Sequence, residues 1–224
     1  MMTMTSPTAI KARSVLRRIG VTRITMSILR SLGYEQLLTK AMKRATHPGD
    51  CVWDVGANVG TYTKLFSDWT QSGKVYSFEP FPETINRLEA HVGALPNVKI
   101  LPVALSDHAG IAHIERGDEE DAATARLVEA GIEIRTERGD ALVEQHVVDR
   151  PELVKIDVEG HELAVLRGMQ SLLGDIKHVF IEVHFAIFGM TGRNQHPSEI
   201  ESLLRNAGFS LSWVDQSHLH AFRT

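Results

Sequence analysis

The sequence is poor in cysteine and in long apolar runs, and both shortages narrow the range of functions. Its single cysteine, Cys51, excludes an internal disulfide and a zinc site built from cysteines, and we expect it to be a small buried side chain. No stretch reaches the roughly 18 uninterrupted apolar residues that a membrane span needs. The N-terminus also lacks the compact apolar core of a secretory signal. We therefore expect a cytoplasmic protein.

Positive charge is not in excess either. The chain has 24 Lys and Arg against 28 Asp and Glu, a formal net charge of -4. A protein that binds nucleic acid would present a basic face, so we expect no nucleic-acid partner. At 224 residues and 43% hydrophobic, the chain is long enough for one well-filled core and short for two. We expect a helical appendage over residues 1–46 and one domain over residues 47–224.

Acidic residues are absent from residues 1–34, where basic residues alternate with apolar ones. The basic residues are Lys11, Arg13, Arg17, Arg18, Arg23 and Arg30. We favour a helix pair whose apolar face packs on the domain and whose arginines are solvated. The alternative is peripheral contact with an anionic membrane surface or a lipid-linked acceptor. The sequence leaves the oligomeric state open, with a homodimer as one option.

The stretch from Val52 to Gly60, VWDVGANVG, is the one around which the chain is organised. Residues 51–55 form a short apolar run that predicts a buried parallel strand, and residues 61–69 continue with helical spacing. Between them, Gly56 and Gly60 would let a ligand approach the backbone closely. The succession of strand, tight turn and helix therefore predicts a nucleotide-like ligand.

Two acids indicate which nucleotide to expect. A dinucleotide site needs G-x-G-x-x-G, whereas this turn reads G-A-N-V-G. Asp54 would repel a pyrophosphate but attract an ammonium or a sulfonium, and S-adenosylmethionine carries both. A second predicted strand, residues 74–78, ends in Glu79, where an acid can accept hydrogen bonds from both ribose hydroxyls. The residues thus favour S-adenosylmethionine over NAD.

Five short motifs resemble those of the FkbM-type S-adenosylmethionine-dependent methyltransferases, in the same order and with similar spacing. They are DVGANVG at 54–60, SFEP at 77–80, VALSD at 103–107, KIDVEGHE at 155–162 and IEVH at 181–184. The resemblance implies an α/β class I methyltransferase (Rossmann-like) fold, a mostly parallel seven-stranded sheet with helices on both faces. It also implies methyl transfer to oxygen, usually a hydroxyl of a sugar or another natural product. The acceptor, a small molecule or a glycolipid, is not specified.

The expected cofactor site combines the glycine turn, the ribose acid and the motifs of the resemblance. Its residues are Asp54, Gly56, Ala57, Asn58, Gly60, Thr61, Glu79, Pro80, Phe81, Ser106, Asp107 and Asp157. In the resemblance, Ser106 and Asp107 stand where side chains meet the adenine ring, although Asp107 also suits a turn. Phe81 could lie on the adenine face, but an aromatic residue there is equally typical of the core.

The rest of the chain alternates between predicted strands and helices, which is the pattern of an α/β fold. We expect helices at 82–91, 140–146, 160–173 and 197–206, strands at 98–103, 111–115, 132–136, 153–156 and 178–183, and an antiparallel pair at 209–214 and 219–222. Residues 115–129 are crowded with charge and predict a solvated loop or a short helix. Insertions on the ligand side of such a fold commonly shape the acceptor pocket.

Acids and histidines gather where two strands are predicted to end. In open α/β sheets, ligands bind outside the carboxyl ends of the strands. The donor is already activated, so the protein must mainly align and deprotonate a hydroxyl. The candidate catalytic residues are Asp157, Glu159, Glu182 and His184, with His161 beside them. Glu159 and Glu162 could instead cap the following helix.

Two mechanisms use these residues, and their spacing permits both. In one, His184 or His161 accepts the proton as general base beside a carboxylate. In the other, Asp157, Glu182 and His184 ligate a divalent metal ion that lowers the pKa of the bound hydroxyl. We favour His184 as base beside Glu182, because no third carboxylate is visible to balance the charge of a cation.

Two other classes of function are weighed against methyl transfer. An NAD-dependent oxidoreductase would need a third glycine in the loop and a hydride-site group, and neither is apparent. A methyltransferase-fold binding protein without catalysis would be expected to have lost the acids at the strand ends, which are present here. Binding of S-adenosylmethionine against NAD would separate these possibilities.

Overall fold

The computed structural model describes residues 34–116, 125–128, 131–193 and 195–223. The predicted basic amphipathic segment, residues 1–34, lies outside this part of the chain except for its last residue. The described helices are α3 (Tyr34–Ala45), α4 (Thr61–Thr70), α5 (Pro82–Val92), α6 (Gly139–Glu144), α7 (Glu162–Gly168), α8 (Phe185–Met190) and α9 (His196–Asn206). None of these helices is long and apolar enough to cross a membrane.

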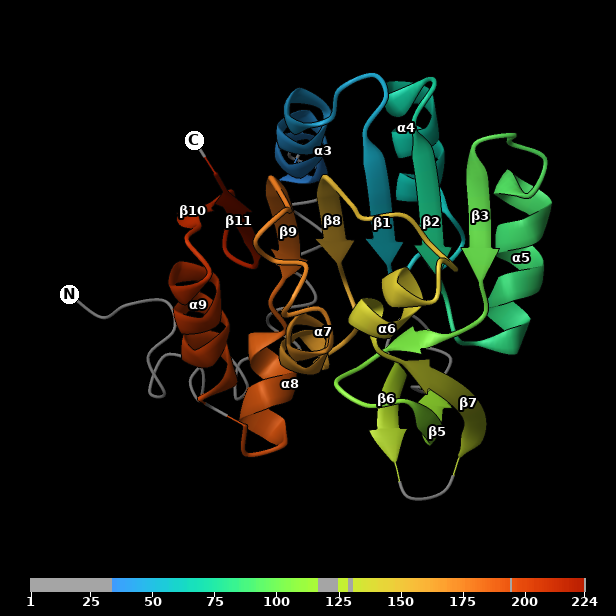
Figure 1. Cartoon of the computed structure of the whole chain (residues 1–224). Helices are drawn as coiled ribbons and strands as arrows, with labels where there is room; N and C mark the ends of the chain where they lie inside the picture. The colour runs from blue at the N-terminus through green and yellow to red at the C-terminus, as the bar shows by residue number, and fades with distance from the viewer. Residues whose placement is uncertain (1–33, 117–124, 129–130, 194, 224) are drawn as a thin grey trace.

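Seven strands form the main sheet in the order β10-β11-β9-β8-β1-β2-β3 (Figure 1). These strands are β1 (Cys51–Val55), β2 (Lys74–Phe78), β3 (Val98–Leu101), β8 (Leu153–Ile156), β9 (His178–Glu182), β10 (Ser210–Trp213) and β11 (His218–Phe222). The first five are parallel, whereas β11 runs antiparallel to both β9 and β10. The predicted class I methyltransferase sheet and its closing antiparallel pair are confirmed.

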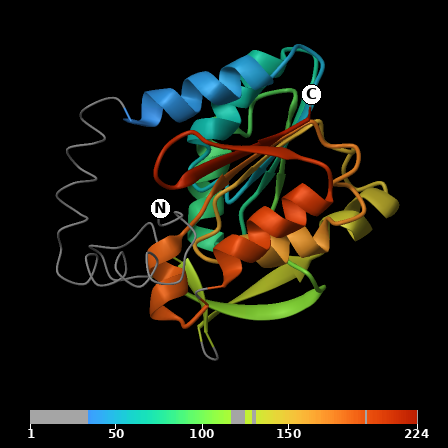
Figure 2. The ribbon, with the colours of Figure 1, turned by 90° about the vertical axis from the view of Figure 1, so that its left-hand side faces the viewer.

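Helices cover both faces of this sheet because its strands alternate their side chains between two cores. On one face, Val52 of β1 packs with Leu38 and Met42 of α3. On the other, Trp53 packs in a core that includes Leu166 of α7 and residues of α6 and α9. Figure 2 shows α3 on one side of the sheet and α7 and α9 on the other. Cys51 is buried, as expected.

A second sheet lies beyond the carboxyl ends of the main strands (Figure 1). It has four strands in the order β4-β7-β5-β6. They are β4 (Ala104–Leu105), β5 (Gly110–Arg116), β6 (Ala125–Val128) and β7 (Ile132–Glu137). The loop or short helix predicted for residues 115–129 is wrong for residues 115–116 and 125–128, which belong to the paired strands β5 and β6 despite the local charge. Residues 117–124 and 129 lie outside the described part.

Two further elements differ from the sequence prediction. The helix predicted over residues 160–173 is reduced to α7, Glu162–Gly168. Met169, Leu172 and Leu173 are still buried, which explains why the apolar spacing predicted a longer helix. The short helix α8, Phe185–Met190, was not predicted, although it borders the cavity described below.

Candidate active site

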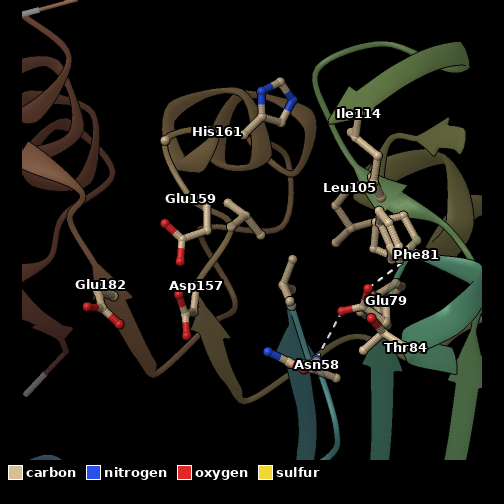
Figure 3. Close-up of a pocket in the computed structure, with 18 of the residues that line it drawn as sticks. Asn58, Glu79, Phe81, Thr84, Leu105, Ile114, Asp157, Glu159, His161 and Glu182 are labelled. Atoms are coloured by element: carbon tan, nitrogen blue, oxygen red, sulfur yellow. Dashed lines mark hydrogen bonds between the residues drawn. The ribbon is translucent and has the colours of Figure 1, made fainter. Parts of the chain in front are cut away.

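A cavity of about 550 Å³ opens at the carboxyl ends of β1, β2 and β8 (Figure 3). This volume is in the range of small-molecule sites, about 300–1,000 Å³. Its walls come from the turn after β1, the ends of β2 and β8, the second sheet, and α8 with the loop that follows it. Parallel strands direct their following loops to one edge, so residues far apart in sequence meet here.

The glycine turn after β1 permits a close approach of two chain segments. Gly56 has φ +77, and a Cβ placed on it would lie 1.8 Å from the carbonyl oxygen of Asp157. Ala57, Asn58 and Thr61 also line the cavity. Gly60 does not, and a Cβ there would lie 2.7 Å from Leu88 of α5. Packing against α5 therefore also requires a glycine at this position, and a role of Gly60 in ligand binding stays a prediction.

Glu79 stands at the end of β2 with its carboxylate in the cavity wall (Figure 3). Its Oε2 accepts a hydrogen bond from the backbone N–H of Asn58 at 3.0 Å, and Oε1 accepts one from Phe81 at 3.0 Å. Burial raises the pKa of Glu79, and these two bonds oppose the rise. Each carboxylate oxygen keeps a further lone pair, so Glu79 could also accept hydrogen bonds from a diol.

The apolar end of the cavity is a slot between the two sheets. Phe81, Leu105 and Ile114 face it in Figure 3, and Ile134 completes it. Phe81 also belongs to a small core with Ile114 and Ile134, and its place on the adenine face stays a prediction. Sequence reasoning missed the two isoleucines, although the alternation along β5 and β7 was the signal. Such a slot suits the flat faces of a purine.

Ser106 and Asp107 are not among the residues that line the cavity, and their contact with adenine stays a prediction. The three residues before them, residues 103–105, do line it. The Ser106 hydroxyl lies 3.0 Å from Nε2 of His161. Asp107 Oδ1 lies 2.8 Å from Nδ1 of the exposed His108, as suits a turn acid.

Asp54 is fully buried beneath the cavity and does not line it. Its Oδ2 accepts a hydrogen bond from the Thr63 hydroxyl at 2.7 Å, and its Oδ1 lies 3.1 Å from Nζ of Lys155. Burial opposes the charge of Lys155, but Asp54 and Asp157 raise its pKa above the ordinary value. In this structure Asp54 thus contacts Thr63 and Lys155, and its direct contact with a ligand stays a prediction. Lys155, a lysine inside an apolar strand, is another cavity residue that sequence reasoning missed.

The structure brings all four candidate catalytic residues together. Asp157, Glu159 and Glu182 line the side of the cavity opposite the apolar slot (Figure 3). Ligand atoms of Asp157, Glu182 and His184 lie within 4.8 Å of one another. Nε2 of His184 lies 3.2 Å from Glu159 and 3.7 Å from Asp157. Glu159 is thus a third carboxylate at this cluster. The sequence-based expectation that no third carboxylate could balance the charge of a cation is therefore wrong.

His184 is buried behind these acids and does not line the cavity. Its Nδ1 contacts the fully buried Glu162, so both ring nitrogens face carboxylates. Burial disfavours the charged imidazole, but Glu159 and Glu162 outweigh it and raise the pKa of His184 well above its usual value. A histidine in this setting is poorly placed to accept a proton from a substrate.

Glu182 contacts His218, which in turn contacts Asp215, and sequence reasoning missed both of these partners. His218 of β11 lies beside Glu182 in the strand register, with its Nε2 3.4 Å from Oε2. Nδ1 of His218 lies 2.7 Å from the buried Asp215. Burial alone would raise the pKa of Glu182, yet His218 and the nearby cations lower it to about 2. Burial raises the pKa of Asp157 to about 6, with Lys155 opposing the rise.

The sequence and the fold of this chain are similar to those of known methyltransferases. The family model "Methyltransferase FkbM domain" matches residues 54–211. The chain is 33% identical over 184 residues to the hexuronic acid methyltransferase AglP of Haloferax volcanii, covering 81% of this chain and 72% of AglP. It is 30% identical over 200 residues to the 31-O-demethyl-FK506 methyltransferase FkbM of Streptomyces tacrolimicus, covering 73% and 74%. A Streptococcus mutans protein crystallised with SAH has a similar fold, with TM-score 0.53, 10% identity, and coverage of 83% and 94%.

Proposed function

The chain belongs to the FkbM family of S-adenosylmethionine-dependent methyltransferases, and from this premise we propose that it methylates a hydroxyl group of a sugar. The sugar could be a small molecule or part of a glycolipid or glycosylated natural product. The observation that carries the proposal is a cavity with two chemically different ends. One end is an apolar slot beside Glu79, and the other is a cluster of carboxylates. The name of AglP, a hexuronic acid methyltransferase, supports a sugar acceptor.

In this proposal the donor spans the cavity from the apolar slot to the acids. The adenine lies between Phe81 and Leu105, and the ribose hydroxyls donate to Glu79. The methionine end follows the turn that begins at Gly56. The methyl group then points toward Asp157 and the acceptor. Alignment of this kind can supply about 7–11 kcal/mol of the barrier in well-oriented reactions.

Asp157, Glu182 and His184 fit a divalent cation, and we propose that they hold one. Their ligand atoms lie within 4.8 Å of one another. Glu162 contacts Nδ1 of His184, which leaves Nε2 facing the acids, as in a histidine oriented by an outer carboxylate. The imidazole favours Mn²⁺, Zn²⁺ or Fe²⁺ over Mg²⁺. When bound, the cation would lower the pKa of the acceptor hydroxyl.

The chain's own residues supply the remaining roles in this proposal. Glu159 lines the cavity and can take the proton that the hydroxyl releases. His218 keeps Glu182 ionised and oriented. Lys155 lies 3.6 Å from Asp157, so it limits the repulsion among the acids. His184 is a positioning and ligating residue here, in place of the base that the sequence favoured.

The decisive experiment measures SAH release from S-adenosylmethionine with a panel of glycosides. We expect a methylated sugar, loss of activity with EDTA, and recovery with one divalent metal. Asp157→Asn should lower kcat by about a hundred-fold or more, because it removes one of the three proposed ligands of the cation and with it several kcal/mol of charge stabilisation. Asp175→Asn is the matched control, because Asp175 is an exposed partner of Arg150.

Three outcomes would contradict parts of this proposal. If EDTA leaves the activity unchanged, no cation takes part in the reaction, and a carboxylate acts as the base without it. A methylated product that mild alkali cleaves would be an ester, so the acceptor would be a carboxylate and not a hydroxyl. Binding of S-adenosylmethionine without turnover on any glycoside would favour the catalytically idle binding protein.

A further inference from the structure

Arg193 is a cationic residue that lines the cavity, whose carboxylate end is where we place the acceptor. It follows α8 and lines the cavity together with Ile187 and Thr191. Its backbone N–H donates to the carbonyl oxygen of Phe188 at 2.8 Å, and its Nη1 donates to that of Gly160 at 3.3 Å. This contact holds the guanidinium beside the backbone of Gly160, which follows Glu159 in the chain, and Arg193 is an exposed residue.

The cavity contains few positive charges that could bind an anionic ligand. Among the described residues that line it, Lys155 and Arg193 are the only lysine or arginine. Lys155 is engaged by Asp54 and Asp157. Arg193 forms no ion pair within the described part of the chain. Burial lowers the pKa of the neighbouring His161, so this histidine adds no charge at neutral pH.

Arg193 lines a cavity that also contains several acids, and this contrast indicates where a negatively charged ligand could bind. Asp157, Glu159 and Glu182 would repel an anionic acceptor from most of this end of the cavity. Arg193 offers one place where an anion is attracted, and a negative group bound there would fix the orientation of the rest of the acceptor. A guanidinium fork matches a carboxylate in a bidentate, planar contact.

We propose that Arg193 binds the carboxylate of a uronic-acid acceptor, so that one hydroxyl of the same sugar is presented to the methyl donor. This inference rests on the proposed sugar methylation and names the class of sugar. A phosphate on a sugar would offer the same negative charge with tetrahedral geometry. The test therefore includes a sugar phosphate beside the uronic acid and the neutral sugar.

Equilibrium binding to the chain loaded with SAH tests the subsite without requiring turnover. Calorimetry is run with methyl glucuronide, methyl glucoside and glucose 6-phosphate. We expect the glucuronide to bind most tightly to the wild type. Arg193→Gln should weaken its binding about ten- to a hundred-fold, leaving the glucoside and SAH unchanged. Arg193→Lys keeps the charge without the fork and should give an intermediate loss.

Arg150→Gln is the matched control, because it removes one arginine whose partner is the exposed Asp175. It should leave every affinity unchanged. Equal or undetectable binding of glucuronide and glucoside would overturn the proposal, as would a preference for glucose 6-phosphate. Weaker SAH binding by Arg193→Gln would also overturn it, because the guanidinium would then hold the cofactor. Arg193-dependent glucuronide binding without methylation would keep this subsite and contradict the proposed reaction.

Discussion

Glu79 shows how one residue can serve both the fold and a ligand. Its carboxylate closes the glycine turn by accepting the backbone N–H of Asn58 and also that of Phe81. It is 7% exposed, so replacement by alanine would leave these donors without their acceptor inside the protein. Any substitution at this position must therefore be tested for stability and for binding separately.

We predict that Glu79→Ala weakens S-adenosylmethionine binding about ten- to a hundred-fold, because hydrogen bonds to a charged group contribute about 1.5–3 kcal/mol. Calorimetry on the folded variant measures the affinity, and urea unfolding without ligand measures the separate cost to the fold. Glu89→Ala, on the exposed surface of α5, is the matched control. If the folded Glu79→Ala protein binds S-adenosylmethionine with unchanged affinity, Glu79 does not contact the cofactor.

At the scale of elements, β9 and β11 place two histidines side by side on one face of the sheet. Nδ1 of His178 lies 3.1 Å from Nε2 of His220. The His220 ring also stacks on Phe180, with centroids 4.1 Å apart and planes at 7°. Burial, together with the nearby His178, lowers the pKa of His220 to about 4. The folded protein therefore holds this imidazole neutral at mildly acidic pH.

This strand pair should make stability sensitive to acid. Between pH about 6.5 and about 4, the unfolded chain protonates His220 while the folded chain does not, so the free energy of unfolding falls as the pH falls. We predict that His220→Phe, which keeps a ring on Phe180, flattens this dependence. Urea unfolding at several pH values measures it. Parallel pH curves for the variant and the wild type would contradict the prediction.

Elements with a regular apolar pattern in their own residues could be predicted from the sequence. Elements that form only by pairing with a strand distant in the sequence could not. Strands β1, β2 and β8 follow from their apolar runs, because both of their faces are buried. Strand β4 depends on pairing with β7, about 30 residues away, and only the folded chain shows it.

The same distinction applies to the site. Asp157, Glu159 and Glu182 were found because strand ends converge in this fold class. Arg193 lines the cavity from the loop after α8, and His218 contacts Glu182 from the last hairpin, so no local pattern marks either residue. The burial of Asp54 could not be predicted, because the sequence does not reveal that Lys155, on the neighbouring strand, pairs with it.

At the scale of the whole molecule, α3 connects the predicted appendage to the domain. Leu38, Met42 and Ala45 are each at most 6% exposed. They share a core with Val52 of the central strand and with other residues of β2, β8, β9 and α4. Helix α3 thus covers one face of the main sheet, although the sequence placed it in the segment before the domain. The boundary between residues 46 and 47 stays a prediction, and this packing makes it testable.

We predict that a chain beginning at residue 47 is much less stable than one beginning at residue 34. Burying a Leu or Met side chain contributes about 1.5–3 kcal/mol, so losing Leu38 and Met42 should cost about 3–6 kcal/mol. That is a large share of the roughly 5–15 kcal/mol that stabilises a typical domain. Urea unfolding of both versions measures the difference, and the version from residue 34 is the control because it retains all of α3. Equal unfolding midpoints would show that α3 is the separable appendage that the sequence suggested, and that the core beneath it is stable when uncovered.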